Sequence, residues 1–71
     1  MTTSLGTRIR NARKEAGLTA EQLAPTVGVT MGTLLRWERD EFAPSVKKLR
    51  RIAEATGQPL TYFISSEGRT A

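Results

Sequence analysis

Residues 19–38 read TAEQLAPTVGVTMGTLLRWE, and this stretch decides the fold. Thr19 followed three residues later by Gln22 is a capping box, which predicts the start of a helix. The apolar residues that follow recur at helical spacing and give the helix one apolar face: Leu23, Ala24 and Val27. Gly28 then ends the helix, because the position after a helix favours a left-handed backbone that glycine adopts without a Cβ clash.

The second half of the stretch predicts another short helix. Thr30 is its predicted cap, and the small apolar side chain of Val29 is expected to pack between the two helices. Leu34 and Trp37 lie three residues apart and are predicted to face inward. The positions left facing outward are Met31, Gly32, Leu35, Arg36 and Arg39. Two helices joined by a tight turn that contains glycine match the helix-turn-helix motif, whose second helix reads DNA.

The rest of the chain predicts an all-α fold of five short helices. Their expected ranges are 5–16, 20–27, 31–39, 46–56 and 60–64, with Ser4 and Ser45 as further caps. The inward residues expected in the first and fourth helices are Leu5, Ile9, Ala12 and Ala16, then Val46, Leu49, Ile52, Ala53 and Thr56. Gly17 and Gly57 are predicted helix stops, and Asp40 falls where the third helix should end in a left-handed residue.

Pro25 is the one irregularity in the second helix. It lies past the first turn, where its ring meets the carbonyl of Glu21, and it has no N–H to donate. An interior proline costs roughly 3 kcal/mol in a regular helix. We therefore expect this helix to bend or to end early at Pro25.

Composition excludes several classes of protein. A chain of 71 residues is one small domain. It has no cysteine and no histidine, so it lacks disulfides, thiolate metal sites and the side chain that most often acts as a base near neutral pH. No apolar run approaches a membrane span, and no signal peptide is recognisable. We expect a cytoplasmic protein that is not an enzyme and has neither a cofactor nor a metal.

The charge balance favours a polyanionic partner. Eleven Lys and Arg oppose seven Asp and Glu, which gives a formal net charge of +4. In a small domain this favours nucleic acid, provided that the cations gather on one face.

The whole pattern resembles the Cro and phage-repressor type of helix-turn-helix domain, also called the XRE family. The likeness is carried, in chain order, by Ile9 and Arg13, GLT at 17–19, EQLA at 21–24, VGVT at 27–30, TLLRWE at 33–38, Ala43-Pro44-Ser45 and LRRIAEATG at 49–57. It implies a lambda-repressor-like domain over residues 1–64. The remaining residues, 65–71, lack an apolar anchor and are predicted to be a disordered tail.

The resemblance also implies which residues meet DNA. In that family the third helix lies in the major groove, and the positions that reach base edges map to Met31, Gly32 and Leu35 or Arg36. Arg36 suits guanine, because its fork can bond O6 and N7 together. The alternative for Arg36 is a phosphate contact or plain solvation. Met31 and Leu35 have no donor and are limited to thymine methyl groups, whereas Gly32 has no side chain.

The phosphate contacts implied by the resemblance are Thr19, Ala20, Thr30, Thr33, Arg39, Lys47, Lys48 and Arg13. Ala20 stands where the family often has glutamine, so unpaired N–H groups at the helix start would hold the phosphate. The family also pairs an arginine of the first helix with a glutamate of the third, which maps to Arg13 and Glu38. Asp40 and Glu41 depart from the pattern, since they would repel phosphate and Asp40 replaces a glycine.

Two functions follow from these observations. The first is a transcriptional regulator, bacterial or phage-encoded, that binds double-stranded operator DNA as a weak dimer. The apolar end of the chain offers its pairing surface, with Tyr62 and Ile64 expected in the interface. The second is a protein-interaction module on the same fold, an antitoxin-like or antirepressor-like partner binder. The apolar outward residues of the third helix motivate it, namely Met31, Gly32 and Leu35.

Overall fold

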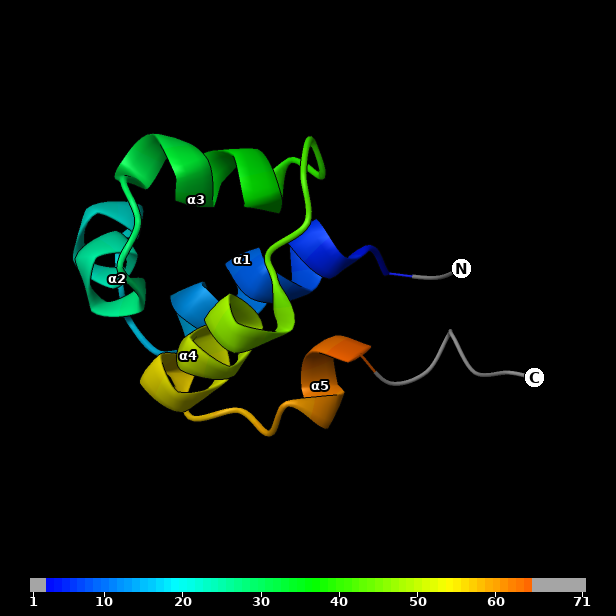
Figure 1. Ribbon diagram of the computed structural model, residues 1–71. Helices are drawn as coiled ribbons and strands as arrows, with labels where there is room; N and C mark the ends of the chain where they lie inside the picture. Colours follow the sequence, from blue (N-terminus) through cyan, green and yellow to red (C-terminus); the bar gives the residue numbers. More distant parts are fainter. Residues whose placement is uncertain (1–2, 65–71) are drawn as a thin grey trace.

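The computed structural model describes residues 3–64, which form five α-helices and no β-strand (Figure 1). The helices are α1 (Leu5–Glu15), α2 (Ala20–Val27), α3 (Met31–Glu38), α4 (Val46–Thr56) and α5 (Thr61–Ile64). In Figure 1, α3 lies across the top of the molecule, α4 and α5 lie at the bottom, and α1 lies between them. The predicted fold class is confirmed, whereas the tail predicted at 65–71 lies outside the described residues. None of the described helices is long and apolar enough to cross a membrane.

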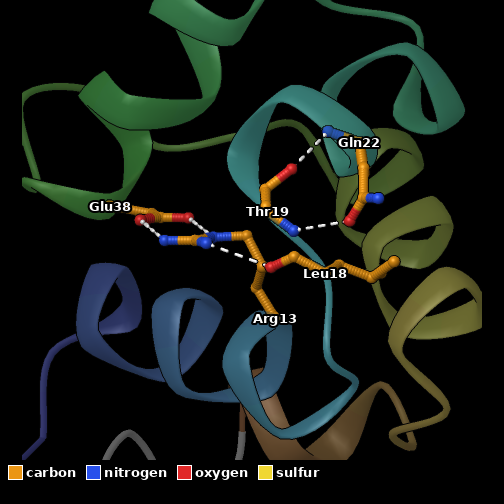
Figure 2. Close-up of polar contacts among 5 residues, drawn as sticks. All are labelled: Arg13, Leu18, Thr19, Gln22 and Glu38. Atoms are coloured by element: carbon orange, nitrogen blue, oxygen red, sulfur yellow. Dashed lines mark hydrogen bonds and ion pairs between the residues drawn. The ribbon is translucent and has the colours of Figure 1, made fainter.

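The first four helices all begin at a hydroxyl side chain. In each, the cap oxygen accepts a hydrogen bond from the N–H three residues later, and the caps are Ser4, Thr19, Thr30 and Ser45. Thr19 completes its capping box, because its own N–H donates to Oε1 of Gln22 at 2.9 Å (Figure 2). Such a cap is worth about 1 kcal/mol, so the sequence specifies these boundaries locally.

The same four helices end in a left-handed residue. Three of these residues are glycines with φ between 76° and 87°, namely Gly17, Gly28 and Gly57. The fourth is Asp40, with φ 63°. After α3, the N–H of Asp40 donates to the carbonyl of Trp37 at 3.0 Å, and the N–H of Glu41 donates to that of Arg36 at 2.9 Å. This pair of bonds is a Schellman motif, and it sets the direction of the α3–α4 loop.

The core is formed by apolar residues from all five helices: Ile9, Ala12, Leu23, Ala24, Val27, Leu34, Trp37, Leu49, Ile52, Ala53 and Phe63. For two residues, the predicted inward position is wrong. Val46 is 61% exposed, because it begins α4 and helical side chains tilt toward the N-terminus, past the start of the helix. Ala16 is exposed because it is the cap that follows α1 and no longer lies on the buried face.

Pro25 does not end its helix, so the prediction of an early end is wrong. α2 continues through Pro25 to Val27. The helix has only eight residues, and both of its ends are fixed independently, by the capping box and by the bond from the N–H of Val29 to the carbonyl of Ala24. Pro25 and Glu21 are both exposed, so water can satisfy the Glu21 carbonyl that loses its helical donor.

Gly6 lies where α1 closely approaches the end of α3, a contact that the local sequence pattern does not predict. Its N–H donates to Oδ1 of Asp40 at 2.9 Å. A Cβ at this position would lie 2.5 Å from the carbonyl oxygen of Glu38 and 2.6 Å from that of Trp37. The N-terminal end of α1 therefore rests on the C-terminal end of α3, where the two helix dipoles attract each other.

Gly6→Ala is expected to destabilise the domain by about 1–3 kcal/mol, because the new methyl group meets backbone that cannot move aside. Gly32→Ala is the matched control, since it lies in an exposed helix with no atom closer than 3.9 Å to the added Cβ. That change is expected to stabilise the domain by about 0.5–1 kcal/mol. Urea denaturation of both variants measures the difference, and effects of the same sign would contradict the close approach.

Candidate nucleic-acid interface

α3 presents one face to the core and the other to solvent. Leu34 and Trp37 anchor the inner face, with Leu34 fully buried and Trp37 6% exposed. The residues predicted to meet bases or phosphates lie on the outer face: Met31, Gly32, Arg36 and Arg39 are exposed, and Leu35 is half-buried. The structure thus brings the predicted base contacts together on a single surface.

A buried ion pair joins α1 to α3 behind that surface. Nε of Arg13 lies 2.7 Å from Oε2 of Glu38, and Nη2 lies 3.0 Å from Oε1, so the fork is bidentate (Figure 2). The remaining terminal nitrogen donates to the carbonyl of Leu18 at 3.1 Å, in the loop before α2. The side chains are only 12% and 5% exposed. Hydrogen bonding to Glu38 raises the pKa of Arg13 above its ordinary value, so this arginine stays charged.

Three arginines surround a shallow cavity beside the pair. The cavity has a volume of about 240 Å³ and is lined by Arg10, Arg13, Leu35, Glu38 and Arg39. Glu38 is already bound to Arg13, so the cavity keeps a net positive charge. Arg10 was not among the predicted contacts. Its position three residues before Arg13 on the same helix was the available signal, since such residues share a helix face.

The start of α2 offers backbone donors for an anion. Within residues 3–64, the N–H groups of Ala20 and Glu21 have no hydrogen-bond partner. The N–H of Thr19 is occupied by Gln22, so of Thr19 only the hydroxyl hydrogen remains available. The carboxylate of Glu21 lies in the same turn and opposes an incoming phosphate.

The start of α3 is already internally bonded. The hydroxyl of Thr30 accepts a hydrogen bond from the N–H of Thr33 at 3.2 Å, and it donates one to the hydroxyl of Thr33 at 3.1 Å. Among the described residues, the donors left for a ligand at this helix start are the hydroxyl hydrogen of Thr33 and the N–H groups of Met31 and Gly32.

α4 begins with two cations and no acid. Lys47 is exposed, whereas Lys48 is half-buried. A Cβ built on Gly28 would lie 3.5 Å from Nζ of Lys48 and 3.3 Å from Nη1 of Arg51, so both cations lie beside the C-terminal end of α2. Lys47 is the freer of the two lysines. A cation at a helix N-terminus is repelled by the positive end of the helix dipole, so these lysines do not stabilise α4. They are instead well placed to attract an anionic ligand.

No group of three or more acidic, histidine or cysteine side chains that could hold a metal ion occurs among residues 3–64.

Comparisons with known proteins place these features in one family. A family model described as helix-turn-helix matches residues 9–63. An uncharacterized HTH-type transcriptional regulator of Methanothermobacter thermautotrophicus is 48% identical over 52 residues, which are 73% of this chain and 75% of that protein. The immunity repressor protein of Bacillus phage phi105 is 34% identical over 64 residues, 90% of this chain but only 44% of the repressor.

A solved structure agrees with this result. The solution structure of the DNA-binding domain of the P22 C2 repressor matches with a TM-score of 0.86 and 28% sequence identity. The match covers 94% of this chain and 88% of that domain.

Glu38→Gln is expected to destabilise the domain by about 1–3 kcal/mol, because it weakens charge-assisted hydrogen bonds in a buried site. The matched control is Glu41→Gln, which removes the exposed pair between Arg39 and Glu41 at 3.3 Å. That change is expected to cost less than about 1 kcal/mol. The two free energies of unfolding come from urea denaturation, and equal losses would show that burial does not strengthen the Arg13–Glu38 pair.

Proposed function

The chain belongs to the helix-turn-helix family of DNA-binding transcriptional regulators, and we propose that it binds a double-stranded DNA operator by placing α3 in the major groove. The observation that carries this proposal is the outer face of α3, where Arg36 projects from a helix anchored by a buried tryptophan and a bidentate ion pair. A rigidly held helix with an exposed arginine suits sequence readout. We expect the chain to act as a repressor in the cytoplasm.

Base readout is assigned to the outer face of α3. Arg36 would bond guanine through its two outer nitrogens, and the exposed side chain of Met31 would touch a thymine methyl group. Leu35 is half-buried, so only part of its side chain is offered to a base. Gly32 leaves a gap in this face and makes no side-chain contact.

Phosphate contacts would flank the readout helix. The start of α2 contributes Thr19 and the N–H of Ala20. The start of α3 contributes the hydroxyl of Thr33, and Thr30 would contact phosphate only by giving up its hydrogen bond to that hydroxyl. Cations supply the remaining contacts: Arg13 and Arg39, with Arg10 added from the cavity, and Lys47 and Lys48 from α4.

The acidic loop is compatible with this role. The carboxylate of Asp40 already accepts the N–H of Gly6, and that of Glu41 lies 3.3 Å from Arg39. Both charges are drawn toward protein donors, which lessens the repulsion of phosphate expected from the sequence.

A dimer would supply the required specificity. One short helix reads only a few base pairs, whereas two recognition helices about 34 Å apart read a palindrome. We assign the pairing surface to α5, where Ile64 is 54% exposed. Tyr62 contributes less, because it is half-buried against the core and its carbonyl accepts a hydrogen bond from Arg8.

The competing function is a protein-binding module. The specific observation in its favour is the apolar part of the α3 face, where Met31 is 47% exposed. DNA binding that falls steeply with salt would favour the regulator, and absence of such binding would favour a protein partner.

Arg36→Ala is expected to weaken binding to the selected operator by about 1–3 kcal/mol, with little effect on random DNA. The operator is first selected from a random DNA pool with the wild-type protein, and affinities are then measured on both DNAs. An equal loss on the two DNAs would show that Arg36 touches only phosphate.

Lys47→Ala is the matched comparison, because it removes a phosphate contact and no base contact. It is expected to weaken operator and random DNA alike and to lower the slope of log affinity against log salt by about 1. An unchanged slope would remove Lys47 from the interface.

Ile64→Lys is expected to abolish cooperative binding to a palindromic operator while leaving binding to a single half-site intact, because a charge there opposes an apolar pairing surface. Sedimentation with each DNA counts the bound domains. Cooperative binding at the wild-type level, or one domain per palindrome with the wild-type protein, would contradict the assigned dimer.

A further inference from the structure

We propose that Phe42 is a positioning residue for Arg36, holding its guanidinium group where it can read guanine. The inference rests on the proposed function and adds a specificity-determining residue outside the helix-turn-helix itself. The observation behind it is a direct contact: Cζ of Arg36 lies over the ring of Phe42, 5.7 Å from the ring centroid. At this distance a guanidinium group is attracted to the negative face of the ring.

Phe42 has no role in the core. Its side chain is 53% exposed and is absent from the buried apolar cluster, unlike the aromatic residues Trp37 and Phe63. Because about half of the residue stays exposed, Phe42 gains less from hydrophobic burial than a core aromatic residue does, and the contact with Arg36 is a specific interaction of its ring.

The backbone places the ring beside Arg36. The N–H of Glu41 donates to the carbonyl of Arg36 at 2.9 Å, and this bond returns the chain toward α3 directly before Phe42. The left-handed turn at Asp40 makes the return possible, and its carboxylate is fixed by the N–H of Gly6. The position of Phe42 is therefore set by backbone bonds rather than by its contact with Arg36 alone.

An aromatic ring holds an arginine without occupying its donors. Within residues 3–64, the side chain of Arg36 makes no hydrogen bond and no ion pair, so its N–H groups remain available to a base. A carboxylate in the same place would compete with guanine for those donors and would repel the phosphates nearby. The nearest acid in sequence to Phe42, Glu41, is paired with Arg39 instead.

Restraint of Arg36 matters because a free arginine has many rotamers. Fixing such a side chain on binding costs conformational entropy, and a side chain that is already oriented loses less. Phe42 would thereby favour the bidentate geometry that distinguishes guanine from other bases, without touching the base itself.

The test measures the preference for guanine at the operator position that Arg36 reads. The proteins are wild type, Phe42→Leu, Phe42→Trp and Val46→Ala, and the DNAs differ only at that base pair. Phe42→Leu is expected to lower the guanine preference about two- to five-fold, the equivalent of an exposed cation–π contact. Phe42→Trp restores the ring and should retain the preference. Val46→Ala changes another exposed apolar residue, at the start of α4, and should leave the guanine preference unchanged.

A second background separates positioning from direct contact. In Arg36→Ala, the change Phe42→Leu is expected to have no further effect on guanine preference. An equal loss in both backgrounds, or no loss in the wild-type background, would overturn the role of Phe42. Urea denaturation of Phe42→Leu should give wild-type stability, and a loss of guanine preference that tracks destabilisation would also overturn it.

A measurement without DNA keeps this inference separate from the proposed function. In the free wild-type protein, the ring current of Phe42 should shift the NMR signals of the Arg36 δ-methylene protons upfield, and Phe42→Leu should abolish the shift. Absence of the shift overturns the positioning contact even where DNA binding is sequence-specific. Presence of the shift in a protein that selects no DNA sequence would overturn the proposed function and, with it, the role in guanine readout.

Discussion

The buried fork between Arg13 and Glu38 is the interaction on which the arrangement of the site depends. One guanidinium group bonds the carboxylate of α3 and the carbonyl of Leu18, so it fixes α1, α3 and the loop before α2 relative to one another. The removal of either partner would leave a buried charge without compensation. Because α3 and the loop that leads into α2 are both bonded to the same side chain of α1, the outer face of α3 is oriented relative to the start of α2.

The charges around that face are arranged so that donors stay free. Each acid at the end of α3 and in the loop after it has a protein partner: Glu38 has Arg13, Asp40 has the N–H of Gly6, and Glu41 has Arg39. Arg36, by contrast, contacts only an aromatic ring among the described residues. The result is a positive surface despite the acidic loop, a property that depends on pairing in space and not on the number of charges in the sequence.

The elements governed by local rules were predicted from the sequence, whereas several residues whose roles depend on tertiary contact were missed. Caps and left-handed stops depend on a few neighbouring residues, so the helix boundaries were correct within one or two residues. The early end predicted at Pro25 was wrong because two independently fixed ends hold a short helix together despite one lost bond. Gly6, Arg10 and Phe42 were missed because their roles come from distant segments, which a single sequence without its fold does not bring together.

Asp40 illustrates why a departure from a family pattern can be informative. Glycine would adopt the left-handed turn after α3 with less strain, since a non-glycine residue there carries a Cβ. Glycine has no side-chain acceptor, however, and so cannot bond the N–H of Gly6 at the start of α1. The carboxylate of Asp40 makes this bond and is also attracted to the positive end of the α1 dipole. The same turn leads through the Glu41–Arg36 bond to Phe42. The aspartate therefore couples the packing of α1 on α3 to the position of the ring beside Arg36, and it links one end of the loop to the surface that we propose for recognition at the other.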